Sequence, residues 1–141
     1  MSNRILRSLV ACAVALLLGA PLTAGAQVSA VAAPGRSMTA AQVAEVFAGV
    51  VTTWPDGTRI QIIENADAAV AREFYQKVVR KPQPIAKAQL TKLALSGQGL
   101  APKRAANDAE VLELVKKTPG GIGFVLSASV DGSVAELHKA P

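Results

Sequence analysis

The stretch from Lys116 to Val134 constrains the fold of this chain more than any other. Two lysines close a helical pattern, and Thr118-Pro119 stops it. Two glycines turn the chain, and the apolar run 121–126 predicts a buried strand. Asp131-Gly132 then predicts a turn that brings 134–137 back as the hairpin partner of this strand. The stretch is one helix-to-strand unit around which the rest of the chain is expected to pack.

Upstream of this unit, helical and strand patterns alternate. Capping residues indicate where two of the helices begin: Thr39 with Gln42, and Asn107 with Glu110, each form the pattern of a capping box. The segment 27–33 is either a short edge strand or a frayed terminus. Together the patterns predict an α/β or α+β domain with a small mixed sheet flanked by about four helices. The predicted elements are a helix at about 40–48, a strand at 59–63, helices after 67, 84 and 107, and the strand at 121–126.

The first 26 residues have the pattern of a secretory signal peptide. Arg4 and Arg7 form a basic start, an apolar run covers 9–18, and Ala24-Gly25-Ala26 is a small-residue cleavage site. We therefore predict export to the periplasm or another extracytoplasmic compartment, with residues 27–141 as the mature domain. An uncleaved anchor is the alternative, although the apolar run is short for a membrane span. Lipidation at Cys12 is a further alternative, and it is disfavoured because the apolar segment lies mostly after that residue.

Composition excludes several classes of function. Arg4 and Arg7 belong to the predicted signal, so the net charge falls from +5 to +3 in the mature domain. Aromatic residues make up 4% of the chain, too few for the stacking surfaces that bind nucleic acid. We see no nucleophile with a positioned base and no grouping of histidine and cysteine, and expect no enzymatic activity, cofactor or metal.

Five pieces of the sequence stand in order along the chain: Thr39-Ala-Ala-Gln-Val-Ala-Glu-Val-Phe-Ala-Gly49, Trp54-Pro-Asp-Gly57, Arg72-Glu-Phe-Tyr75, Leu95-Ser-Gly-Gln-Gly99 and Thr118-Pro-Gly-Gly-Ile-Gly-Phe-Val125. In this order they resemble the phosphate-binding proteins of bacterial ABC transporters and their short relatives. The resemblance implies an α/β fold, namely a single lobe of a type II periplasmic-binding-protein-like fold. Full-length members of that family have two lobes with an anion between them, whereas this chain has the length of one.

The loop after the strand at 59–63 departs from this family. In the phosphate carriers this loop carries an arginine and a Ser-Gly-Thr run that hold the anion at a helix amino end. Here it reads Glu64-Asn65-Ala66-Asp67-Ala68, and its carboxylates oppose an anion. The signal peptide, the resemblance and the absence of catalytic residues together predict an exported, non-enzymatic solute-binding-protein-like module, and the departure at this loop predicts that it lacks the phosphate site. The alternative is an accessory module that binds an envelope protein through the lobe face that a second lobe would cover.

Four polar residues remain as ligand-binding candidates, for a small anion or another small solute. Asn65 and Asp67 lie at a strand-to-helix junction, where either one is equally expected to cap the helix. Ser96 and Gln98 lie in a glycine-containing loop that lacks the lysine and the spacing of a phosphate-binding loop. Glu64 with Asp67 also has the residue types of an acid-base pair, but capping explains Asp67 without further assumptions.

Three other features have both a functional and a structural interpretation. His138 is expected to be a surface residue, because no serine or cysteine nucleophile accompanies it. The glycines at 120, 121 and 123 either admit a ligand to the backbone or, as we expect, permit a turn and close packing. Trp54 is expected to be exposed, either as a contact for a partner protein or as a lid over the core.

Overall fold

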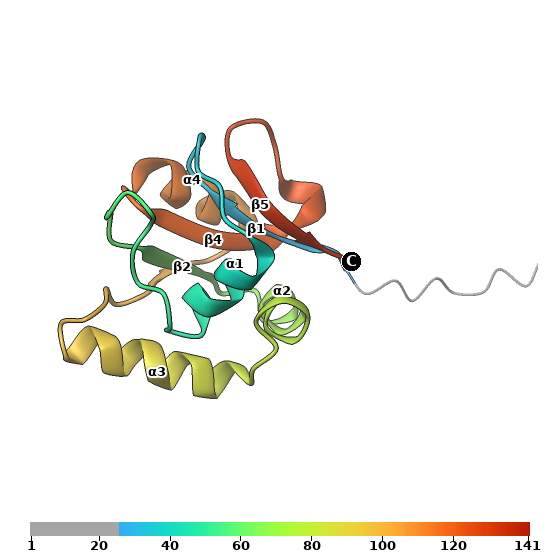
Figure 1. The fold of residues 1–141 in the computed structure, drawn as a ribbon. Helices are drawn as coiled ribbons and strands as arrows, with labels where there is room; N and C mark the ends of the chain where they lie inside the picture. Colours follow the sequence, from blue (N-terminus) through green and yellow to red (C-terminus); the bar gives the residue numbers. More distant parts are fainter. Residues whose placement is uncertain (1–25) are drawn as a thin grey trace, which may run out of the picture.

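The computed structural model describes residues 26–141 (Figure 1). The predicted signal peptide, apart from Ala26, and Cys12 lie outside the described residues. Within the described part, no helix combines the length and the apolar character that a membrane span requires.

The described chain folds as one mixed five-stranded sheet with helices on both faces (Figure 1), which confirms the α/β class. The strands lie in the order β3-β2-β4-β1-β5. Strand β2 is parallel to both of its neighbours, β3 and β4. Strand β1 is antiparallel to both of its neighbours, β4 and β5. The strands are β1 (Val28–Ala32), β2 (Gln61–Asn65), β3 (Lys103–Ala105), β4 (Gly121–Leu126) and β5 (Ala135–Ala140). The helices are α1 (Ala40–Phe47), α2 (Ala68–Phe74), α3 (Gln83–Leu95) and α4 (Asp108–Lys117), with a π-helical turn η1 (Tyr75–Val79) and a 3-10 turn η2 (Ser127–Ser129).

The position of β1 corrects two predictions. Segment 28–32 is a strand, but it is an inner strand and not an edge strand, and all five of its residues are buried. The predicted hairpin between 121–126 and the final segment is also wrong, because β5 pairs with β1. The 3-10 turn η2 and the loop after it carry the chain across β1, a detour too long for the two-residue hairpin that Asp131-Gly132 suggested.

The parallel side of the sheet also differs from the prediction. Strand β2 begins at Gln61, because Arg59 makes only an isolated bridge to Thr53. Strand β3 was not predicted. It has three residues, of which Lys103 and Arg104 are exposed, so it lacks the apolar alternation by which strands are recognised.

Two apolar clusters cover the two faces of the sheet. Successive strand residues point to opposite faces, so Ile62 faces one cluster and its neighbour Ile63 the other. The larger cluster packs the sheet against α1, α2, η1 and α3, and the smaller one packs it against α4. Figure 1 shows α4 on the side of the sheet opposite α1, α2 and α3. The result is a three-layer α/β domain.

The helix starts follow the predicted local signals. Thr39 Oγ1 accepts a hydrogen bond from Gln42 N, and Gln42 Oε1 accepts one from Thr39 N, which confirms that capping box. Asn107 Oδ1 caps α4 by accepting from Glu110 N. The second half of the α4 box is different, because Glu110 Oε2 accepts from Ala106 N, one residue before the cap.

The glycine turn before β4 is closed by Trp54. Gly120 has a φ of +72°, and its carbonyl accepts hydrogen bonds from Trp54 Nε1 and from Gln61 N, both at 3.0 Å. Trp54 is only 2% exposed, so it is a core residue and the expected exposure is wrong. Arg36 covers its ring, with the guanidinium carbon 4.8 Å from the ring centroid. This packing supports the structural interpretation of the glycine turn.

Candidate functional site

The connections between the parallel strands create a crevice at the carboxyl ends of β2 and β3. The chain leaves β2 through α2 and α3 on one face of the sheet and leaves β3 through α4 on the other. In open α/β sheets, ligands bind where two neighbouring connections diverge in this way. The fold therefore points to the end of β2 as the candidate site.

A pocket of about 200 Å³ occupies this crevice, and we call it the carboxyl-end pocket. Its floor comes from the end of β2 and its walls from α2, α3 and β3. The acidic side chain is that of Glu64, and the cations are Lys87 and Arg104. Its lining residues are Glu64, Asn65, Ala66, Ala68, Ala71, Gln83, Lys87 and Arg104.

The side chain of Glu64 is only 11% exposed, and both of its carboxylate oxygens have a partner. Oε1 accepts a hydrogen bond from the Tyr75 hydroxyl at 3.1 Å, and Oε2 lies 3.2 Å from Lys87 Nζ. Arg104 is in register with Glu64 on the neighbouring strand. Since Lys87 is about half exposed, its ammonium group is screened by water and remains accessible to a small ligand.

Tyr75 provides a spectroscopic test of this arrangement. Burial, and then the neighbouring Glu64 carboxylate, raise the pKa of Tyr75 well above its usual value of about 10. The raised pKa means that the folded state holds the proton of Tyr75 more tightly than the unfolded state does. This contribution to the stability of the folded state is fully present below about pH 10 and is lost as the pH rises further. The chain has one tyrosine. In an alkaline titration we therefore expect the tyrosinate absorbance to appear only as the protein unfolds. Circular dichroism, recorded on the same samples, reports the unfolding.

A reversible tyrosinate titration near pH 10 in a folded protein would contradict this expectation. Tyr75→Phe is the matched control, because it removes the hydroxyl and keeps the ring in the core.

The loop that follows β2 is closed by its own hydrogen bonds. Asp67 Oδ1 accepts from Ala69 N at 3.0 Å and from Val70 N at 3.4 Å, so Asp67 caps α2. Asn65 Oδ1 accepts from Asp67 N at 3.0 Å. On its other side, Asn65 Nδ2 donates to Asp108 Oδ1 at 2.6 Å. The amides at the start of α2 thus donate to a carboxylate of the chain itself.

Asp108 ties this loop to the end of β4. Its second oxygen, Oδ2, accepts from Leu126 N at 3.2 Å and from Ser129 Oγ at 2.5 Å. The carboxyl ends of β2 and β4 are therefore joined through one carboxylate at the start of α4. The hydrogen bonds of Asn65 and Asp108 therefore hold the ends of β2 and β4 together.

The four predicted ligand-binding residues do not lie together. Asn65 and Asp67 are at the end of β2, and only Asn65 lines the carboxyl-end pocket. Ser96 and Gln98 follow α3, where Gly97 O accepts from Arg59 Nη2 at 3.0 Å, just before β2 begins. The two pairs are thus separated by the length of β2, roughly 17 Å for a strand of this size. Ser96 Oγ and Gln98 N both donate to Leu93 O and close α3.

The cations of the pocket were missed in the sequence. Lys87 lies on a helix whose polar residues carry no distinguishing pattern, and Arg104 lies on the unpredicted strand β3. Only the pairing of β3 with β2 would have placed Arg104 beside Glu64. No lining residue is a serine, cysteine or histidine, and His138 lies half-buried on β5. The pocket offers ion pairing and hydrogen bonding to a small ligand.

Comparison with solved structures finds a similar fold in proteins of phosphate transport. The chain is similar to a putative phosphate ABC transporter substrate-binding protein with bound phosphate from Clostridium perfringens, with 16% identity, a TM-score of 0.59 and coverage of 79% of this chain and 45% of that chain. An ABC-type phosphate transport receptor from Vibrio cholerae matches at 17% identity and a TM-score of 0.56, over 80% of this chain and 46% of the other. PstS from Borrelia burgdorferi matches at 15% identity and a TM-score of 0.58, over 79% and 47%.

These likenesses establish the fold. The chain spans less than half the length of each of the three proteins, in agreement with a single lobe of the periplasmic-binding-protein-like fold. No protein-family model matches the chain, and no curated protein matches it.

Proposed function

We propose that this protein is an exported, non-enzymatic solute-binding-protein-like module that lacks the phosphate site of its structural neighbours. The observation that carries the proposal is the cap of α2. The helix amides that would hold an anion donate instead to the carboxylate of Asp67. A bound phosphate would have to displace this carboxylate and would then lie beside it, and like charges at contact distance repel each other.

The rest of the loop supports the same proposal. Glu64 is a second carboxylate at the end of β2, and Asn65 is already held by Asp67 and Asp108. Lys87 and Arg104 can attract an anion to the mouth of the pocket, but Lys87 is paired with Glu64. Export is supported by the basic start, the apolar run and the small-residue cleavage site of the first 26 residues.

Isothermal titration calorimetry with phosphate and sulfate tests the proposal. We expect no saturable binding of either anion by the native protein below about 1 mM. The Clostridium perfringens protein, whose structure holds phosphate, is the positive control. Asp67→Ser is the matched variant: serine still caps the helix but carries no charge, so we expect it to bind phosphate more tightly than the native chain. Micromolar phosphate affinity of the native protein would overturn the proposal.

An interaction module for an envelope protein is the second candidate function. It is favoured by a groove along α2, η1 and the start of α3 that is lined by the cations Arg72, Arg80 and Lys81. The groove shares only Gln83 with the carboxyl-end pocket. No acidic side chain lines this groove.

A further inference from the structure

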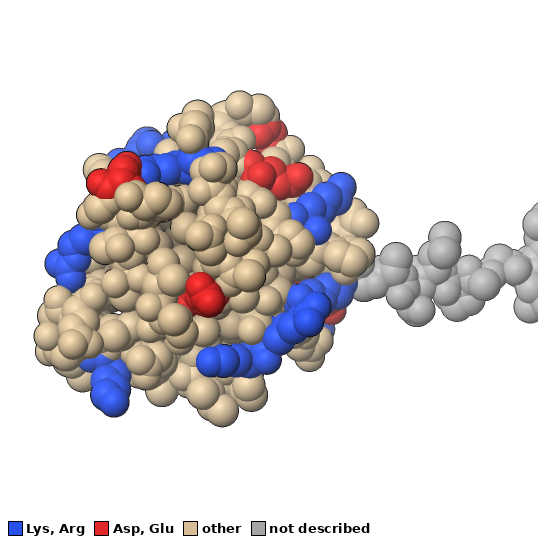
Figure 2. Space-filling view, viewed as in Figure 1, with Lys and Arg blue, Asp and Glu red and all other residues tan. Residues whose placement is uncertain are grey.

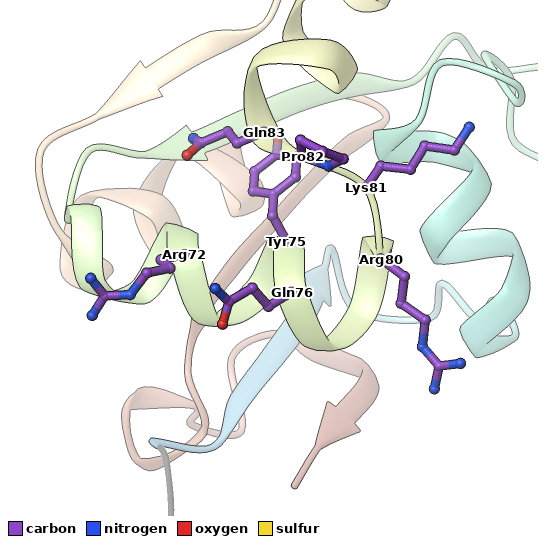
Figure 3. A pocket seen from close by; sticks show the side chains of 7 residues that line it. All are labelled: Arg72, Tyr75, Gln76, Arg80, Lys81, Pro82 and Gln83. Carbon is purple, nitrogen blue, oxygen red and sulfur yellow. The ribbon is translucent and has the colours of Figure 1, made fainter.

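A groove of about 630 Å³ lies along α2, η1 and the start of α3, and we call it the basic groove (Figure 3). One side is formed by the outer surface of α2 and η1, and the other by the connection into α3. Its lining residues are Arg72, Tyr75, Gln76, Arg80, Lys81, Pro82 and Gln83. Three of the seven are cations and none is an acid.

The three cations have no ion-pair partner within residues 26–141. The neighbouring acidic residues, Glu73 and Glu64, each form an ion pair with another lysine. Glu73 Oε2 pairs with Lys77 Nζ at 2.9 Å, and Glu64 pairs with Lys87. Figure 2 shows lysine and arginine side chains gathered over α2 and the start of α3. This surface therefore carries an excess of positive charge that the described chain does not neutralise.

The backbone at one end of the groove is unusual. The chain makes a π-helical turn over Tyr75–Val79, and Arg80 then adopts a left-handed conformation with φ of +57°. Among the described residues it is the only non-glycine residue with positive φ. Glycine is the usual residue at such a helix end, and a side chain there costs free energy. Arginine in place of glycine adds a guanidinium group at the rim of the groove, and π-helical turns are frequent at functional sites.

The arrangement of the lining side chains indicates the shape of the ligand. In Figure 3, Arg72 lies at one end of the groove and Arg80 and Lys81 at the other. Gln76 and Gln83 lie between the ends, and each amide group both donates and accepts hydrogen bonds, as a peptide backbone requires. Pro82, which is exposed, adds apolar surface in the middle.

We propose that the basic groove docks an extended, acidic segment of a partner protein, with carboxylates at both ends and a short uncharged middle. The cations are spread along the groove, from Arg72 at one end to Arg80 and Lys81 at the other, and this spacing suits an extended chain. The proposal rests on the second candidate function, for which it names the partner's chemistry. The groove lies outside the loop at Asp67, so the phosphate titration and the docking test can fail separately.

Fluorescence anisotropy with the purified protein tests the docking. The probe is a labelled peptide of about eight residues, roughly 26 Å long when extended, with two glutamates at each end and uncharged residues between. A peptide with glutamine at the four positions is its control. We expect the glutamate peptide to bind, the glutamine peptide not to bind, and the affinity to fall as salt is raised.

Three variants locate the site. Arg72→Gln, Arg80→Gly and Lys81→Gln are each expected to weaken binding about threefold, as for an exposed ion pair, and the triple variant about 30-fold. Arg80→Gly separates docking from folding, because glycine suits the left-handed position and the unfolding temperature should stay equal or rise. Lys92→Gln is the matched control, since it removes one cation from α3 outside the groove and should leave binding unchanged.

Several results would overturn the inference. They are equal binding of the glutamine peptide, native affinity in the triple variant, and the same loss of affinity in Lys92→Gln as in Arg80→Gly. Sedimentation of the protein with phosphatidylglycerol vesicles, when the peptide does not bind, would assign the groove to a membrane surface instead.

Discussion

Phe124→Ala is expected to lower the free energy of unfolding by about 3–5 kcal/mol, a large part of the 5–15 kcal/mol that holds most domains folded. Phe124 is fully buried on β4 and stacks on Phe74 of α2, with ring centroids 4.3 Å apart and planes at 6°. Phe47 of α1 meets the same ring edge-on at 5.7 Å. The substitution therefore leaves a cavity where α1, α2 and the sheet meet.

Urea denaturation followed by the fluorescence of the single tryptophan, Trp54, measures this loss. Phe124→Leu is the control that keeps most of the apolar volume and removes the ring, and it is expected to cost less than Phe124→Ala because the cavity left behind is smaller. A loss of less than about 1 kcal/mol in Phe124→Ala would show that the aromatic cluster does not stabilise this junction.

Gly120→Ala is expected to cost about 2–5 kcal/mol, for two reasons that add. Gly120 has a φ of +72°, which alanine adopts only with strain. A Cβ atom at this position would also overlap the carbonyl oxygen of Arg59, a backbone atom that cannot move aside freely. The shift that relieves this overlap would weaken the bonds from Trp54 Nε1 and Gln61 N to Gly120 O.

Gly132→Ala is the matched control for this prediction. A Cβ atom at Gly132 would meet nothing within 4 Å, so the change should alter stability by less than about 0.5 kcal/mol. Thermal unfolding of both variants and the native protein gives the comparison. An unfolding temperature of the Gly120 variant equal to that of the Gly132 variant would refute the structural role of the turn and reopen its interpretation as a ligand contact.

Only some residues of the candidate site could be predicted from the sequence. Asn65 and Asp67 were recognised because a polar pair between a strand and a helix is a local signal, visible within a few residues. Lys87 and Arg104 were not, because each reaches Glu64 only through the packing of α3 and the pairing of β3. The basic groove was missed for the same reason, since its cations line one surface only in the folded chain.

The sequence by itself determined the features that depend on neighbouring residues. The capping box of Thr39 and Gln42, the cap of Asp67 on α2 and the glycine turn at Gly120 are interactions within a few positions along the chain. The alternation of helical and strand patterns limited the class to α/β or α+β.

Only the tertiary structure decided the strand order and which residues line the carboxyl-end pocket and the basic groove. The strand β1 lies between β4 and β5, although it comes first in the chain and its partners come last. Its five buried residues favour a central position, and that preference is satisfied only by strands about one hundred residues away, where Ser29 Oγ donates to Glu136 Oε2. Burial is a property of the whole packed domain, which is why no local pattern specified it.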